Sequence, residues 1–178
     1  MRPGKTEETV RNLEPLEPAD APARSRELLA DIVTRHGSAG EMVRTMAHSP
    51  ALLAGYLDLS RALKRVKLSR ALSEKISLAA QEWIGCAHCL AAHAQAGRAA
   101  GLSEADIELA RQGTAADARE AALVAFAVQV LAEPSGITGA DLAGLRGHGW
   151  SDRIIAEVVG LVTLNLLTGS FNLVAGTG

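Results

Sequence analysis

The chain has 178 residues, of which 48% are hydrophobic and 3% aromatic, and its formal net charge is −2. This length and apolar content suit one domain with a buried core, and a net charge near zero gives no electrostatic indication of nucleic-acid binding. Alanine and leucine, two strong helix formers, dominate the sequence, while glycine and proline separate the apolar-periodic stretches. We therefore expect an all-α protein with no nucleic-acid partner.

The first 22 residues are charged and contain four prolines, without the apolar stretch of a signal peptide. We expect residues 1–22 to form an arm, residues 23–178 to form one helical domain, and the protein to be cytoplasmic. Helices are then expected over 23–36, which ends at Gly37, and over 40–47. Ser49 and Pro50 predict the start of the next helix, and another helix is expected from about residue 70 to Trp83.

In the second half, an alanine-rich helix is expected from Cys86 to about residue 100. Three further helices begin at cap-like residues, Ser103, Asp117 and Thr138, and the last runs from Ser151 to about residue 173. Together these stretches predict a single-domain bundle of about eight helices. Trp83 and Trp150 are expected to anchor the core because large aromatic side chains bury much apolar surface.

Residues 154–174 are apolar enough to span a membrane, but Glu157, Asn165 and Asn172 interrupt the stretch. We expect no membrane partner. A buried or subunit-interface helix explains the pattern better, and it predicts a homo-oligomer.

The only two cysteines, Cys86 and Cys89, are three positions apart and follow Gly85. If Cys86 opens a helix, then Cys86, Cys89 and His93 share one face, and the unpaired amides at the helix start stabilise a thiolate. A pair at this spacing can close a disulfide with little backbone movement. The helix dipole favours a thiolate on Cys86, whereas proximity to His93 favours Cys89.

Glu74 lies twelve residues before Cys86, which is roughly 18 Å along a straight helix. A chain break at Gly85 would fold the preceding helix back and bring Glu74 toward His93. A carboxylate beside a histidine orients the ring, so the residues then suit proton transfer to and from a thiol. Zinc binding by the cysteines with His88 and His93 is an alternative, but a second cysteine pair for a structural site is missing. Two inert core cysteines are another alternative.

The pattern Glu-x11-Cys-x-His-Cys-x3-His, from Glu74 to His93, resembles the AhpD-like alkylhydroperoxidases of the carboxymuconolactone decarboxylase superfamily. The Gly-His-Gly-Trp-Ser-Asp stretch at 147–152 and the Asn-x5-Phe-Asn stretch at 165–172 are similar to the peroxidase-related branch. The resemblance covers roughly residues 45–175. It implies an all-helical fold, trimers or hexamers, and neither a metal nor a bound flavin.

The resemblance also implies a role for each residue of this pattern. Cys89 would attack an organic hydroperoxide and Cys86 would resolve the product. Glu74 and His93 would relay the proton, and His88 would assist, although His88 alone suits a solvent-facing position equally well. The electron donor would be an external dithiol, such as a lipoyl-bearing protein.

Three other functions remain open at this stage. The pair suits a protein disulfide oxidoreductase, or a redox sensor in which the disulfide alters a partner interface. A decarboxylase or isomerase of the same superfamily is the third, and the cysteine pair argues against it because carboxymuconolactone decarboxylases generally lack that pair. We expect a thiol-dependent peroxidase.

Overall fold

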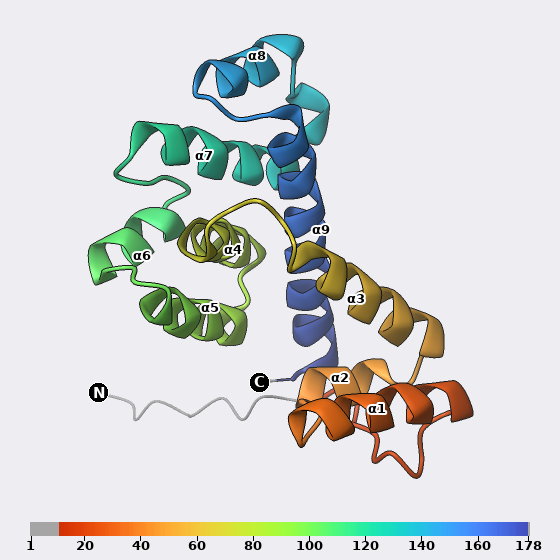
Figure 1. Ribbon diagram of the computed structural model, residues 1–178. Coiled ribbons are helices and arrows are strands. Elements are labelled where there is room, and N and C mark those ends of the chain that lie inside the picture. Colours follow the sequence, from red (N-terminus) through yellow and green to blue (C-terminus); the bar gives the residue numbers. More distant parts are fainter. Residues whose placement is uncertain (1–10, 178) are drawn as a thin grey trace, which may run out of the picture. The chain divides into compact units, whose positions relative to one another are not determined.

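The computed structural model describes residues 11–177, and within that range the chain is helical without a single strand. The predicted all-α class is confirmed, with nine α-helices in the described range where about eight were expected (Figure 1). The elements are α1 (Ala23–His36), α2 (Glu41–Met46), α3 (Pro50–Leu63), α4 (Arg70–Ile84), α5 (Ala87–Ala99), α6 (Glu104–Arg111), α7 (Ala118–Ala132), the 3₁₀ helix η1 (Pro134–Gly136), α8 (Gly139–Gly147) and α9 (Asp152–Ala175).

The described residues divide into two compact units: residues 11–59 together with residues 171–177, and Ser60–Ser170. The first unit has its own core, centred on Leu29, Met46 and Leu53. The described part of the predicted arm is hydrogen-bonded within this unit: the amides of residues 12 and 13 donate to the carbonyl oxygen of Ala175 at 2.9 and 3.1 Å. Residues 1–10 of the arm lie outside the described range.

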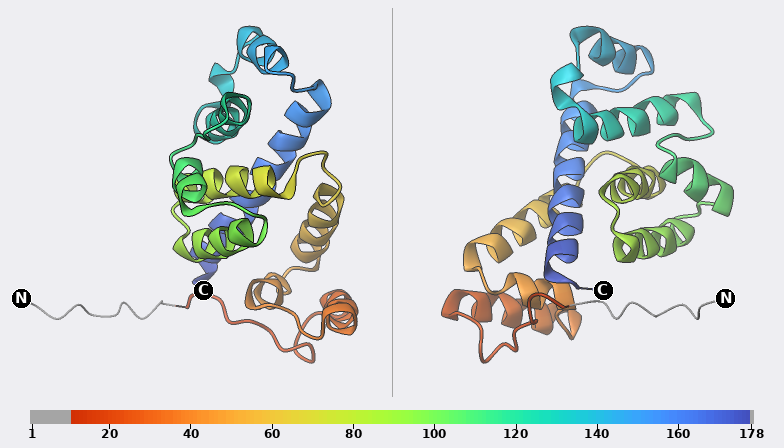
Figure 2. Two further views of the ribbon diagram at one scale, coloured as in Figure 1. Left: turned by 60° about the vertical axis from the view of Figure 1, so that its left-hand side comes forward. Right: turned by 180° about the vertical axis from the view of Figure 1, so that it is seen from behind.

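Helix α4 is the central element of the second unit, with α5, α6 and α7 grouped around it (Figure 2). One side of α4 packs on α7 and on the first half of α9 through Ile76, Leu123 and Val158. A second cluster joins Leu78 of α4 to Ile107 of α6. Because α4 is covered on more than one side, its residues from 75 to 81 are all buried.

One charged residue of α4, Lys75, is buried in the second unit. The Nζ of Lys75 lies 2.7 Å from a carboxylate oxygen of Glu120 on α7 and 3.8 Å from one of Asp106 on α6. A buried ammonium is tolerated only with such partners. Lys75 therefore ties three helices together.

Two of the expected helix starts are full capping boxes. In each, the cap hydroxyl accepts a backbone hydrogen bond from the third helical residue, whose carboxylate accepts one from the cap amide. These pairs are Ser103 with Asp106 and Thr138 with Asp141. Asp117 also caps α7 as expected.

The two tryptophans differ in burial. The Trp150 side chain is buried; its Nε1 donates to the carbonyl oxygen of Arg119 at 2.8 Å, and the Arg119 guanidinium lies 3.7 Å from the ring centroid. Trp150 is thus the core anchor that the sequence predicts, holding the α8–α9 turn against α7. Trp83 is half exposed, so the expectation of a core role for it was wrong. It lies in the last turn of α4, beyond the part of the helix that is buried on all sides.

Helix α9 is long and apolar enough to cross a membrane by length and composition alone, a test that core helices of water-dissolved proteins also pass. Residues such as Val158 and Val162 are buried in the second unit's core. Packing within the described residues therefore accounts for part of the helix's apolar character.

Candidate active site

A tight turn between α4 and α5 places the cysteines. Gly85 has φ 82° and ψ 21°, a left-handed conformation that ends α4. The amides of Gly85 and Cys86 both donate to the carbonyl oxygen of Gln81, at 2.9 and 3.2 Å. The predicted chain break at Gly85 is confirmed, and its consequence is that Cys86 begins the next helix.

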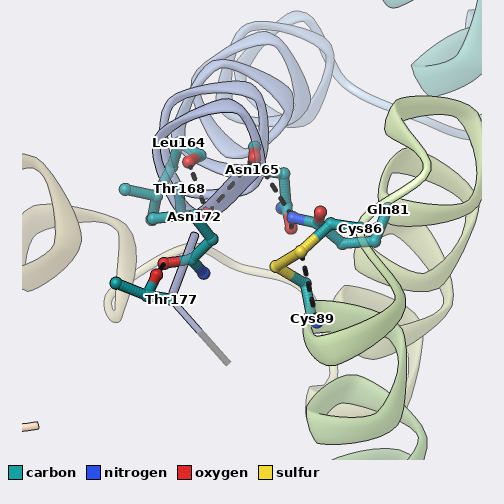
Figure 3. Close-up of a disulfide and its surroundings, with 8 residues drawn as sticks. All are labelled: Gln81, Cys86, Cys89, Leu164, Asn165, Thr168, Asn172 and Thr177. Carbon is teal, nitrogen blue, oxygen red and sulfur yellow. Dashed lines mark hydrogen bonds between the residues drawn. A yellow bond between two sulfur atoms is a disulfide. The ribbon is translucent and has the colours of Figure 1, made fainter. Parts of the chain in front are cut away.

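Cys86 is the N-cap of α5, and its Sγ accepts a hydrogen bond from the Cys89 amide at 3.3 Å. The two residues form a disulfide, with their Cα atoms 5.3 Å apart (Figure 3). Both are buried, with 2% of Cys86 and 6% of Cys89 exposed. The pair therefore has the helix-start position that stabilises a thiolate after reduction.

The fold-back at Gly85 also brings Glu74 of α4 to His93 of α5. The Nδ1 of His93 lies 2.8 Å from Glu74 Oε2, and the second carboxylate oxygen lies 3.3 Å from Nε of Arg70. The Glu74 side chain is 12% exposed and that of His93 is 31% exposed. The expected approach of Glu74 to His93 is confirmed.

The remaining titratable residues near the turn point elsewhere. His88 is exposed, and within the described residues it makes no hydrogen bond. Glu82, one turn before Cys86, forms an ion pair with Arg111 at 2.8 Å. Among the described residues, no group of three or more histidine, cysteine or acidic side chains is arranged to hold a metal ion.

Sequence reasoning missed a buried amide network next to the cysteine turn. The Nε2 of Gln81 donates to the main-chain oxygen and Oδ1 of Asn165 on α9, at 3.1 and 3.0 Å (Figure 3). Asn165 in turn donates from Nδ2 to Ser77 Oγ at 3.2 Å and to the carbonyl oxygen of Leu161 at 3.0 Å. The available signal was the spacing of Ser77 and Gln81, two polar residues one turn apart on the apolar face of α4.

Comparisons with known proteins agree with this architecture. Residues 50–133 match the model of the Carboxymuconolactone decarboxylase family. No curated protein sequence matches the chain. Among solved structures, an uncharacterized peroxidase-related protein from Ralstonia eutropha JMP134, described as an alkylhydroperoxidase AhpD core, has a TM-score of 0.76 at 21% identity, over 92% of this chain and 88% of that one.

Two further solved structures share the fold. A peroxidase-related protein from Silicibacter sp. TM1040 has a TM-score of 0.74 at 21% identity, over 98% of this chain and 93% of that one. The debrominase Bmp8 has a TM-score of 0.70 at 18% identity, over 90% and 88%, and a variant of it was solved with 2,3,4-tribromopyrrole. Residues 50–133 thus resemble the Carboxymuconolactone decarboxylase family, and the chain has the fold of these AhpD-like structures.

Proposed function

We propose that the protein is a thiol-dependent peroxidase that reduces organic hydroperoxides through Cys86 and Cys89. The observation that supports this most is the joint placement of two groups by one turn: a disulfide at the start of α5 and a Glu74–His93 hydrogen bond between α4 and α5. Peroxide reduction by a dithiol needs a redox pair and a proton-transfer pair close together, and here the second pair joins the helix of the cysteines to the helix before it.

The reaction balances as a two-electron transfer. The Cys89 thiolate attacks the terminal oxygen of the hydroperoxide, the O–O bond breaks, Cys89 becomes a sulfenic acid, and the alkoxide leaves as an alcohol after gaining a proton. The Cys86 sulfur then attacks the Cys89 sulfur, which forms the disulfide and releases hydroxide, protonated to water. An external dithiol restores the pair by disulfide exchange and is itself oxidised.

The Glu74–His93 pair supplies the proton transfers in this scheme. An ionised Glu74 accepts from Nδ1–H of His93, so the other ring nitrogen, Nε2, is the free base. It takes the thiol proton of Cys89, one helical turn away, and returns it to the alkoxide. The Nε of Arg70 lies 3.3 Å from the other carboxylate oxygen of Glu74. His88 has the minor, assisting role because it is exposed.

The burial of both cysteines favours a small oxidant over a folded protein substrate. A protein disulfide oxidoreductase, the alternative function, must present a sulfur atom to a second protein, and here 6% or less of each cysteine is exposed. The same burial suits a reductant whose dithiol is carried on a long, thin arm. We therefore propose a lipoyl-bearing protein as electron donor, with no bound cofactor.

Mass spectrometry after one equivalent of cumene hydroperoxide tests the function. The reduced protein should lose two hydrogens and regain them with dihydrolipoamide. Cys89→Ser should consume no peroxide, whereas Cys86→Ser should react once and leave a trappable sulfenic acid on Cys89. Glu74→Gln and His93→Gln should slow the first step by about 10²- to 10⁴-fold. Thiols that persist beside unreacted peroxide, but exchange with a protein disulfide, would favour the alternative.

A further inference from the structure

One buried acceptor beside the cysteine turn has no donor in the disulfide form. Gln81 is fully buried, and its Oε1 makes no hydrogen bond. The orientation of the carboxamide is fixed because Nε2 faces two acceptors, the main-chain oxygen and Oδ1 of Asn165, so Oε1 cannot exchange places with it. Leaving a buried acceptor unpaired is costly, and such atoms are rare in proteins.

The surroundings of Oε1 leave few candidates for its partner. On the α9 side it lies against Gly169, where a Cβ atom would come within 2.5 Å of it. The side-chain amide of Asn165 is already used, because its Nδ2 donates to Ser77 and Leu161. On the other side Gln81 adjoins the cysteine turn, since its own carbonyl oxygen accepts from the Cys86 amide at 3.2 Å (Figure 3).

Reduction creates the donor that is missing. In the disulfide neither sulfur carries a proton, whereas a dithiol reductant breaks the S–S bond, transfers two electrons and leaves thiols. We propose that Oε1 of Gln81 accepts a hydrogen bond from the Cys86 thiol in the reduced protein, so that Cys86 stays protonated and the thiolate forms on Cys89. This inference rests on the proposed function, in which Cys86 is the resolving cysteine and Cys89 attacks the peroxide.

The hydrogen bond opposes the effect of the helix start. As N-cap of α5, Cys86 accepts from the Cys89 amide, which by itself would favour a thiolate on Cys86. An amide oxygen can pair only with the protonated thiol and therefore favours the neutral form. The titratable side chains closest in sequence to the pair are Glu82 on α4 and His88 and His93 on α5, with Glu74 hydrogen-bonded to His93; α9 carries no charged residue after Glu157. Gln81 is thus an uncharged positioning residue that distinguishes the two thiols.

A contact made only by the dithiol stabilises the reduced state, so it raises the reduction potential. Gln81→Met keeps the length of the side chain and removes the acceptor. The equilibrium constant for reduction of the pair, measured against dithiothreitol by free-thiol quantification, should fall by about two- to tenfold, or about 9 to 30 mV. The matched control is Ser77→Ala, which removes a more distant contact of the same network but keeps Oε1; its potential should stay at the wild-type value.

An unchanged potential in Gln81→Met, or an equal shift in both variants, would overturn the proposal. If Gln81→Met does not fold, infrared spectroscopy of the Cys89→Ala protein decides. Its single thiol, that of Cys86, should show the lowered S–H stretching frequency of a hydrogen-bonded thiol, and a free-thiol frequency would refute the contact. None of these measurements uses peroxide, so the inference and the peroxidase function fail independently.

Discussion

Substituting Gly169 by alanine tests whether the Gln81 carboxamide is held as the structure shows. Replacing a glycine in the middle of a helix by alanine normally stabilises the protein by up to about 1 kcal/mol. At Gly169 the new Cβ would lie 2.5 Å from Oε1 of Gln81 and 3.0 Å from Cγ2 of Ile84. Something must move, and whether it can move cheaply determines the sign of the effect.

The Gln81 side chain is flexible in isolation, but here its movement breaks hydrogen bonds. Turning Oε1 away also displaces Nε2 from both oxygens of Asn165, in a place without water to replace them. Overpacking of this kind costs about 1–3 kcal/mol, and an unpaired buried polar group costs a similar amount. The gain in helix propensity offsets part of these costs, and we expect Gly169→Ala to lower the free energy of unfolding by about 1–3 kcal/mol.

Urea denaturation followed by circular dichroism measures the loss, with Gly144→Ala as control. Gly144 lies in the helix α8, is exposed, and has open space where its Cβ would be, so alanine there should stabilise by up to about 1 kcal/mol. Adding Gln81→Ala to Gly169→Ala should remove the clash, which a double-mutant cycle would report as favourable coupling. Stabilisation by Gly169→Ala comparable to that of the control would refute the reasoning.

Two further substitutions test charges in the second unit. Lys75→Met should destabilise by about 1–3 kcal/mol in thermal denaturation, because it leaves Glu120 and Asp106 without their shared partner; the partial exposure of those carboxylates, 28% and 30%, limits the loss. An unchanged melting temperature would contradict this. The pKa of Glu157 is lowered by the Lys67 backbone amide and the Arg153 guanidinium. The ionised side chain therefore adds to the free energy of unfolding above about pH 4.3, and this stabilisation is lost as the pH falls through the lowered pKa. Glu157→Gln should therefore cost about 1 kcal/mol at pH 7, and the difference should vanish in acid; a difference independent of pH would argue against the ionised contact.

Features set by neighbouring residues were predictable from the sequence. Gly85 ends α4 and Cys86 caps α5 because a left-handed glycine and a cap are local devices, readable within a few positions. The fold-back of Glu74 onto His93 then followed from the location of the break. The spacing of the cysteines indicated the disulfide for the same reason.

Features set by distant residues were not predictable. Gln81 and Asn165 are 84 positions apart, and no local pattern indicates that they pair. Lys75 is buried because α6 and α7 bring carboxylates to it, whereas its sequence context gives only a polar residue in a helix. Trp83 is exposed because it follows residues 75–81, the part of α4 that tertiary packing buries on all sides. Hydrophobicity alone predicted the opposite.

The last prediction is that copies of this chain form an oligomer through helix α9. Val159, Thr163 and Leu166 follow one another at helical spacing on its exposed side, with 41% of Val159 and 42% of Leu166 accessible. From residue 158 to 177 the sequence has no charged side chain, so this side offers apolar contacts without ionic repulsion. A symmetric contact between copies buries such a stripe most simply.

An arginine at Leu166 would place a charge in that contact and should dissociate the assembly. Burying an unpaired charge costs several kcal/mol, and a symmetric interface includes the substitution once for every copy, so its effect is repeated. Light scattering at micromolar concentration should show a multiple of the 18.5 kDa chain mass for the wild type and a smaller species for Leu166→Arg. The control, Ala143→Arg on the exposed side of α8, should keep the wild-type mass. A wild-type protein that scatters as a single chain would show that α9 leaves its apolar stripe in water.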